Sequence, residues 1–337
     1  MDETFIIAEA GANHNRNFKQ AIALIDAAVD AGANAVKFQT YSSETLYSKH
    51  TPDFAGYKDI TKLIKDIEIP RVWQKVLKDF CDGSGIEFMS TPFDEKAVDE
   101  LYDLGVKRFK IAGFEATDPR FVKYVASAGL PVIVSLGIGT NINNWSNIKE
   151  WILSENDSAD ITFLHCNHSY PTPYEDINLG QMKLLQQWAE NQSMNIKVGL
   201  SDHTEYILVP PIAVALGAKV VEKHYTISRE LPGPDHPFAI EPDELAQMVK
   251  NIRLTEKMLG EKKNEYTESE EAFVTAQRSV VVKGDIKKGD EITLNNITTK
   301  RPLLEDSIPA AEYYNIIGKN FNTDLKDDMI LKRSEIE

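Results

Sequence analysis

Two histidines in this sequence stand where neighbouring strands would end. His203 closely follows the apolar run 196–200, and His224 directly follows the next apolar run, 218–223. Neighbouring parallel strands lie about 5 Å apart, so imidazoles at their ends can converge on one ion. Imidazole binds many divalent metals, and two histidines leave coordination positions open for water and substrate. A lone strand-end histidine is more often a hydrogen-bonded structural residue, but the pair makes a metal site an equally good interpretation.

Two lysines lie inside apolar runs, Lys37 in 35–39 and Lys110 in 108–111. A buried ammonium group is costly unless an opposite charge pairs with it. The two lysines therefore indicate a clamp for phosphate and carboxylate groups, or a Schiff base formed by one of them. A third reading is that each side chain simply reaches solvent at the end of its strand.

Carboxylates accompany the histidine pair. Glu9 ends the first apolar run, and it lies beside the eighth run if the strands close into a barrel. It is then near the expected metal, either as a general base for a metal-bound water or as a group that orients a histidine. Asp202, next to His203, has the same two alternatives. His165 and Cys166 are interpreted as packing or supporting groups.

Eight short apolar runs alternate with amphipathic stretches in the first 260 residues, and these runs must position the chemistry. They are 5–8, 35–39, 86–90, 108–111, 131–135, 161–166, 196–200 and 218–223. Continuous apolar runs are typical of parallel strands buried on both faces, and eight such units predict a (β/α)8 TIM barrel. The rival, a doubly wound sheet, would normally place a glycine-rich phosphate turn after the first strand, and residues 11–14 do not form one.

The pattern changes after residue 260. Residues 261–276 are polar and acidic and are predicted to be a linker, whereas residues 277–337 contain short β runs at 279–282 and 291–293 and many turn residues. A weak internal repeat occurs here, because Asp-Ile-Lys at 285–287 returns as Asp-Leu-Lys at 324–326. We therefore expect a small β-rich domain of about 60 residues in this part of the chain.

Composition limits the classes of function. The chain has 337 residues and a net charge of −15, and it contains no basic region of the kind that binds nucleic acid. No apolar run reaches the roughly 18 residues of a membrane-spanning helix, and the first residues lack the basic start of a signal peptide. The two cysteines provide no disulfide framework. We expect a cytoplasmic protein without nucleic-acid or membrane partners, although lysines in a pocket can still bind a small anion.

Several motifs in this order resemble the sialic acid synthase family, which makes N-acetylneuraminate and related nonulosonates. They include Phe-Ile-Ile-Ala-Glu at 5–9, Val-Lys-Phe-Gln-Thr at 36–40, Gly-Leu-Ser-Asp-His-Thr at 199–204 and Glu-Lys-His-Tyr-Thr at 222–226. The tail, with Lys-Arg-Pro at 300–302, resembles the antifreeze-like (SAF, β-clip) domain of that family. The resemblance implies a TIM barrel followed by this small domain.

The resemblance also implies a reaction. Phosphoenolpyruvate condenses with the open-chain aldehyde of an N-acylated hexosamine, giving a nine-carbon 2-keto-3-deoxy sugar acid and phosphate. A divalent ion, Mn²⁺ or Mg²⁺, polarises the aldehyde and holds the attacking water. Arg301 matches an arginine that one subunit's tail inserts into its partner's site, so a domain-swapped homodimer is implied.

The matching positions assign the remaining roles. The implied catalytic residues are Glu9, Lys37, Asp202, His203 and His224, with His203 and His224 as the metal ligands. The implied phosphoenolpyruvate ligands are Lys37, Thr91, Lys110, Ser135, His168 and Ser201. The implied sugar contacts are Gln39, Glu115, Tyr170, Asp235 and Arg301.

The chain departs from the family pattern in a few places, and these leave the sugar open. Gly113 stands where the family often has serine, His168 where it often has asparagine, and Leu136 follows Ser135 where threonine is common. Phe114 is expected to reshape the sugar pocket. A legionaminate- or pseudaminate-type sugar is therefore an alternative acceptor. Two further alternatives are a Schiff-base aldolase and a binding protein that has lost catalysis.

Overall fold

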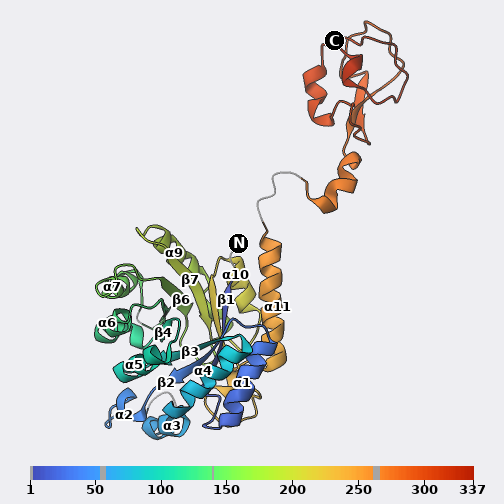
Figure 1. Ribbon diagram of the computed structural model, residues 1–337. Helices are drawn as coiled ribbons and strands as arrows, with labels where there is room; N and C mark the ends of the chain where they lie inside the picture. Colours follow the sequence, from blue (N-terminus) through green and yellow to red (C-terminus); the bar gives the residue numbers. More distant parts are fainter. Residues whose placement is uncertain (1–2, 54–57, 139, 261–265) are drawn as a thin grey trace. The chain divides into compact units, whose positions relative to one another are not determined.

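The computed structural model describes residues 3–53, 58–138, 140–260 and 266–337 (Figure 1). The chain divides into two compact units, Met1–Gly260 and Glu261–Glu337. Each unit has its own buried hydrophobic cluster. Among the described residues, no helix is both long enough and apolar enough to cross a membrane.

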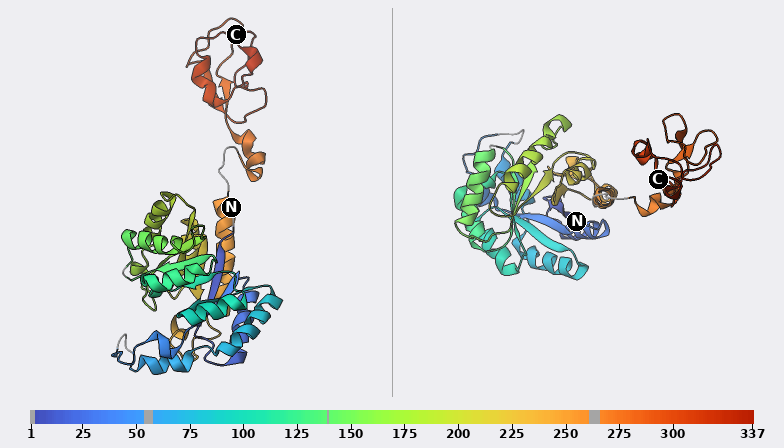
Figure 2. Two further views of the ribbon diagram at one scale, coloured as in Figure 1. Left: turned by 60° about the vertical axis from the view of Figure 1, so that its left-hand side comes forward. Right: turned by 90° about the horizontal axis from the view of Figure 1, so that it is seen from above.

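The first unit is built on one parallel sheet of eight strands, ordered β3-β2-β1-β8-β7-β6-β5-β4. The strands are β1 Phe5–Gly11, β2 Ala35–Thr40, β3 Glu87–Pro92, β4 Phe109–Ile111, β5 Val132–Leu136, β6 Ile161–Cys166, β7 Ile196–Asp202 and β8 Val220–His224. The pairing of β1 with β8 and the packing of β3 against β4 close the sheet. The predicted TIM barrel is confirmed, and Figure 2 shows its helices surrounding the strands.

The helices follow the strands around the barrel. They are α1 Phe18–Asp30, α2 Ser43–Leu46, α3 Ile60–Ile67, α4 Gln74–Ser84, α5 Glu95–Leu104, α6 Pro119–Ser127, α7 Ile142–Leu153, α8 Tyr174–Ile177, α9 Gly180–Glu190, α10 Val209–Ala215 and α11 Pro242–Leu259. Local sequence sets several of their starts. Asn17 caps α1 by accepting hydrogen bonds from the Lys19 and Gln20 amides, and Asp94 caps α5 in the same way through the Ala97 amide.

The strands carry two interior layers because every second side chain of a strand faces the same way. The lower layer is a buried apolar cluster made of Ile7, Ala35, Met89, Ile133, Leu164 and Val220. Two residues further along most of these strands, toward their carboxyl ends, the interior layer becomes polar. Its members are Glu9, Lys37, Thr91, Ser135 and Glu222, and all are buried. The apolar layer thus forms the floor of a polar cavity.

The second unit contains an antiparallel pair, β9 Ser279–Val282 and β10 Ile297–Lys300. The β run predicted at 291–293 is wrong as a strand, because only Glu291 forms an isolated bridge and a turn closed by the Thr293 and Asn296 backbones follows. Within the predicted linker, Glu268–Ala276 forms a 3-10 helix, and residues 261–265 lie outside the described residues.

The weak internal repeat is visible as a pair of matching segments in the second unit. Ile286 and Leu325 form an antiparallel bridge. Lys287 Nζ lies 2.7 Å from Asp324 Oδ2, and Lys326 Nζ lies 2.7 Å from Asp285 Oδ2. The two copies therefore pair with each other in a near-symmetric way.

Candidate active site

A cavity of about 500 Å³ opens at the carboxyl ends of the barrel strands. Its polar lining includes Glu9, Lys37, Gln39, Thr91, Lys110, Ser135, His168, Tyr170, Ser201, His203, Glu222, His224 and Asp235. The strands end here together because all eight are parallel. Active sites of TIM barrels form at this face, so the cavity is the candidate active site.

Two buried lysines and two buried glutamates form the centre of the cavity. Lys37 Nζ lies 2.6 Å from Glu9 Oε2 and 3.7 Å from Glu222 Oε2, and it donates a hydrogen bond to Thr91 Oγ1 at 2.9 Å. Lys110 Nζ lies 3.4 Å from Glu222 Oε1. Glu222 therefore bridges the two ammonium groups, and it accepts a further hydrogen bond from Ser201.

This arrangement shifts the protonation of each member. Burial alone would lower the pKa of Lys37, but the carboxylates of Glu222 and Glu9 outweigh it and raise that pKa. Burial lowers the pKa of Lys110, and Glu222 offsets only part of the effect. The pKa of Glu222 is lowered because Lys110 and Lys37 outweigh its burial. Burial raises the pKa of Glu9 to about 7, so this carboxyl group can gain or lose a proton near neutral pH.

Ser135 contributes a polar side chain whose hydrogen-bonding capacity is not satisfied by the described residues. Its hydroxyl is buried against the cavity, and no hydrogen-bond partner for it lies among the described residues. Buried hydroxyls normally have a partner. A ligand oxygen next to the two lysines would supply one, as expected for an anion site.

The histidine pair stands beside this charged group. The ring centroids of His203 and His224 lie 5.4 Å apart. His203 Nδ1 lies 2.6 Å from the Asn167 carbonyl oxygen, so Nδ1 carries the proton and Nε2 keeps a free lone pair. Burial lowers the pKa of His203 to about 3 and that of His224 well below its ordinary value. Both rings are thus neutral at pH 7, the state that ligates metal.

The histidine pair is therefore compatible with a divalent ion. His224 Nδ1 is buried without a hydrogen-bond partner in the described chain, and it lies 3.8 Å from Asp235 Oδ2. No group of three or more His, Cys, Asp or Glu side chains among the described residues is arranged to hold a metal. An ion here would take two imidazoles and complete its coordination with water or substrate.

Asp202 does not reach this cavity. It is one residue beyond Ser201, so its side chain faces the helices, where its Oδ2 lies 2.7 Å from Lys223 Nζ. Both side chains are almost fully buried there. Because successive side chains of a strand face opposite sides of the sheet, the expectation that Asp202 is catalytic is corrected. The same rule explains His165, whose Nε2 lies 2.7 Å from the Ile177 carbonyl oxygen outside the barrel.

Glu222 and Glu115 also differ from the expected assignment. The sequence places Glu222 among the polar groups at the strand ends but assigns it no role; it lies two positions before His224 on β8 and therefore faces inward. Glu115 is absent from the lining of the central cavity and instead lines a neighbouring hollow with Phe114 and Tyr41. Burial raises the pKa of Glu115 to about 7. The central cavity is thus more charged at its base than the sequence indicated.

His168 lies against two glycines at the edge of the cavity. A Cβ atom on Gly113 would lie 2.2 Å from the His168 ring, and one on Gly137 would lie 1.7 Å from it. Its Nδ1 is 3.4 Å from the Ile138 amide, and the Phe114 ring centroid lies 4.5 Å away. Gly113 and His168 both differ from the family pattern, and the two differences are linked. The imidazole of His168 occupies the space that a side chain at position 113 would need.

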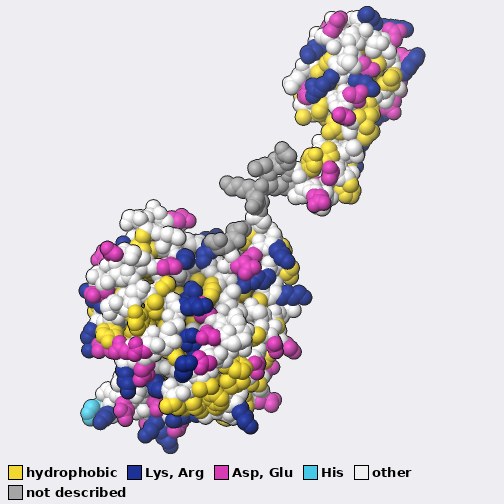
Figure 3. Space-filling model, viewed as in Figure 1, with side chains coloured by type: hydrophobic (Ala, Val, Ile, Leu, Met, Phe, Trp, Pro, Cys, Tyr) yellow, Lys and Arg dark blue, Asp and Glu magenta, His cyan; other side chains and the backbone are white. Residues whose placement is uncertain are grey.

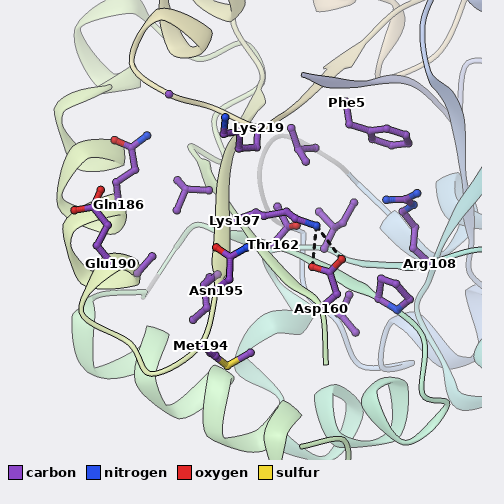
Figure 4. Close-up of a pocket in the computed structure, with 18 of the residues that line it drawn as sticks. Phe5, Arg108, Asp160, Thr162, Gln186, Glu190, Met194, Asn195, Lys197 and Lys219 are labelled. Carbon is purple, nitrogen blue, oxygen red and sulfur yellow. Dashed lines mark hydrogen bonds and ion pairs between the residues drawn. The ribbon is translucent and has the colours of Figure 1, made fainter. Parts of the chain in front are cut away.

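Other surfaces are less suited to chemistry. A hollow of about 850 Å³ lies at the opposite, amino-terminal end of the barrel (Figure 4). Its Lys197 lies 2.8 Å from Asp160, and both are half exposed, while Arg108 lies over the Phe5 ring. On the face seen in Figure 3, basic and acidic side chains are interspersed. The buried, mutually perturbed groups at the carboxyl end distinguish the cavity there as the candidate active site.

Comparisons with known proteins agree with this location. Residues 24–264 match the NeuB family, and residues 277–337 match the SAF domain. The chain is 36% identical over 344 residues to N,N'-diacetyllegionaminic acid synthase of Legionella pneumophila, covering 99% of this chain and 94% of the relative. It is 34% identical over 342 residues to pseudaminic acid synthase of Campylobacter jejuni, covering 99% and 97%.

A solved structure is also similar. The N-acetylneuraminic acid (sialic acid) synthetase of Leptospira borgpetersenii, crystallised with citrate, superposes with a TM-score of 0.71 at 34% identity. The match covers 81% of this chain and 90% of that chain. With the family match extending over most of the barrel, the chain belongs to the NeuB family of sialic acid-type synthases.

Proposed function

We propose that this protein condenses phosphoenolpyruvate with the open-chain aldehyde of an N-acylated hexosamine, forming a nonulosonic acid and releasing phosphate. The observation that carries the proposal is the buried polar layer in which Lys37 and Lys110 flank Glu222 beside two neutral histidines. In a chain with an overall charge of −15, two buried lysines at one cavity favour an anionic ligand.

Phosphoenolpyruvate would bind across the lysines. Lys37 and Lys110 supply charge-assisted hydrogen bonds to its phosphate and carboxylate groups, and the free Ser135 hydroxyl supplies a neutral one. Ser201, Thr91 and His168 line the same cavity and complete the set. Because these groups come from different strand ends, they hold the enol carbon in one orientation toward the acceptor.

A Mn²⁺ or Mg²⁺ ion would be held by His203 and His224. When bound, it would act as a Lewis acid toward the acceptor aldehyde and the attacking water. In the condensation, the methylene carbon of phosphoenolpyruvate forms a bond to the aldehyde carbon, water adds to carbon 2, and the phosphate leaves. Glu9 is suited to accept the proton of that water, because burial places its pKa at about 7.

The acceptor would occupy the outer part of the cavity, where Gln39, Tyr170 and Asp235 line it. Its identity is an N-acylated hexosamine or a modified sugar of the legionaminate or pseudaminate type, and the names of the relatives include both types. We further propose a homodimer in which Arg301 of the second unit completes the partner's site. Exposed apolar side chains on loops at the mouth, Phe114 and Ile138 among them, support a covering partner.

A Schiff-base aldolase is the second candidate, favoured by one observation. Burial lowers the pKa of Lys110, as an imine-forming amine requires. The carboxylate of Glu222 at 3.4 Å instead favours the charged form that binds an anion. Borohydride reduction in the presence of substrate separates the two functions: a covalent adduct at Lys110 or Lys37 would support the aldolase, whereas the proposed synthase gives none.

The main test is release of phosphate from phosphoenolpyruvate with a panel of N-acylated hexosamines. Turnover should require both substrates and a divalent ion. Lys110→Met should lower kcat/KM by about 10²-fold or more, since it removes a buried cation from the anion site. Lys123→Met is the matched control, because Lys123 is on α6 and is partly exposed in a pair with Glu155. Absence of phosphate release with every acceptor, or equal effects of both variants, would overturn the proposal.

A further inference from the structure

One side of the candidate active site is apolar, unlike the strand ends. Five side chains from α2 and α3, here called the apolar wall, line the cavity: Leu46, Ile60, Leu63, Ile64 and Ile67. All of them except Ile60 belong to one hydrophobic cluster with Tyr41 and Phe93, which also line the cavity and whose rings meet edge to face with centroids 5.6 Å apart. The wall is therefore part of a packed apolar cluster.

Helix α3, which follows α2 in Figure 1, is amphipathic, and the side chains of its apolar face line the cavity. Ile60, Leu63, Ile64 and Ile67 follow the i, i+3, i+4, i+7 spacing of one helix face. Lys62 and Lys65 are exposed on the other face. Ile60 and Ile67 are buried, but Leu63 and Ile64 keep part of their surface open. Apolar surface left open within a cavity gains free energy when an apolar ligand group covers it.

The wall and the charged base of the cavity serve different parts of a ligand. The segment that carries α2 and α3 follows β2, whereas the histidine pair follows β7 and β8. In the sheet order, β1 and β8 separate β2 from β7, so wall and histidines stand apart around the mouth. An acceptor whose aldehyde meets the histidines and phosphoenolpyruvate would extend its other end toward Leu63 and Ile64.

We propose that Leu63 and Ile64 are specificity-determining residues that receive apolar substituents of the acceptor sugar. The class they select is a hexosamine with a second N-acyl group or a deoxy carbon in place of a hydroxymethyl group. Hydroxyl groups lose hydration without a hydrogen-bond partner against this wall, whereas methyl groups gain by burial. The inference rests on the proposed function, since it takes the acceptor to be an aldehydic amino sugar.

The experiment compares two acceptors, N-acetylmannosamine and 2,4-diacetamido-2,4,6-trideoxymannose, at saturating phosphoenolpyruvate. One buried methyl or methylene group changes kcat/KM by about 10-fold or more, so we expect at least that preference for the second sugar. Leu63→Ala with Ile64→Ala should remove about 10-fold of that preference. The KM for phosphoenolpyruvate should stay unchanged, because its ligands are on the strand ends. Lys65→Ala, on the outer face of the same helix, is the matched control.

Each outcome has a distinct meaning. If the double variant lowers kcat/KM equally for both sugars, or raises the KM for phosphoenolpyruvate, α3 only encloses the cavity and the inference is wrong. A preference of the unchanged protein for N-acetylmannosamine would also contradict the inference. Ile64→Thr, which keeps the branch at Cβ but shortens the side chain and adds a hydroxyl, provides the second variant if the double variant does not fold. Turnover of no acceptor at all would overturn the proposed function itself, and this inference with it.

Discussion

The buried ion pair between Asp202 and Lys223 is expected to hold the two histidine-bearing strand ends together. Asp202 precedes His203 on the chain, and Lys223 precedes His224. Asp202 Oδ2 lies 2.7 Å from Lys223 Nζ, while Asp202 Oδ1 accepts a hydrogen bond from the Thr204 amide at 3.0 Å. Lys223 Nζ also donates to the Thr204 carbonyl oxygen. Removing Lys223 should therefore destabilise the barrel and disturb the metal site.

The magnitude follows from the burial of the pair. At 2.7 Å and an effective dielectric constant of about 20, the attraction is about 6 kcal/mol, most of it offset by desolvation. Lys223→Met leaves a buried carboxylate unpaired, so we expect a loss of about 3–5 kcal/mol in the free energy of unfolding. For a unit of this size, that corresponds to a fall of about 10 °C in Tm. Asp202→Asn combined with Lys223→Met should recover most of the loss.

Calorimetry and metal titration of the same variants provide the assay. Lys223→Met should also weaken Mn²⁺ binding to the protein without substrates, because the turn that carries His203 loses two hydrogen bonds to Lys223. Lys197→Met is the control, since Lys197 is also on β7 and its pair with Asp160 is half exposed, with an expected cost of about 1 kcal/mol or less. The reasoning is refuted if Lys223→Met costs no more than this control, or if the double variant loses the sum of its single effects.

Three further predictions concern catalysis, pH and assembly. Glu9→Gln should lower kcat by about 10²–10⁴-fold with little change in the KM for phosphoenolpyruvate, as measured by steady-state phosphate release; a near-normal kcat would contradict the role as a base. Burial lowers the pKa of His14 to about 4 from 6.5, so below pH 6.5 the unfolded chain binds a proton that the folded chain does not. The free energy of unfolding should therefore decrease as the pH falls from 6.5 to 4, by about 2 kcal/mol at pH 5 for one such group. His14→Gln should reduce this pH dependence of the free energy of unfolding, as measured by urea titrations. Finally, Arg301→Ala and His203→Ala should each be nearly inactive alone, but about a quarter of all active sites should become active when the two variants are refolded together. No recovery of activity would show that Arg301 acts on its own barrel.

The sequence predicted the barrel and most of the cavity for one physical reason. Parallel strands end at the same face, and interior side chains recur at every second residue. Glu9, Lys37 and Lys110 therefore reach the cavity as expected. The error at Asp202 comes from using nearness in sequence instead of strand parity, since Ser201 and His203 face inward and the residue between them cannot.

Features made by loops were harder to predict. The contact of His168 with Gly113 and Gly137 joins segments that follow three different strands, and only packing shows that the imidazole fills the space above both glycines. Glu115 begins a 3-10 helix, which carries it into the neighbouring hollow. The helical spacing of α3 is visible in the sequence, but its turn toward the cavity depends on tertiary contacts with Tyr41 and Phe93.

Glu222 is a counterion shared by the two buried lysines of the cavity. Burial by itself lowers the pKa of both ammonium groups, so each would lose its proton more readily without a counterion. By lying 3.7 Å from Lys37 and 3.4 Å from Lys110, Glu222 favours the charged form of both lysines. Together with Glu9 it outweighs the effect of burial on the pKa of Lys37, and at Lys110 it offsets part of that effect. An arriving dianion then strengthens this charge state further. The carboxylate at the base and the two lysines above it therefore form one unit, in which Glu222 prepares the lysines for the anion.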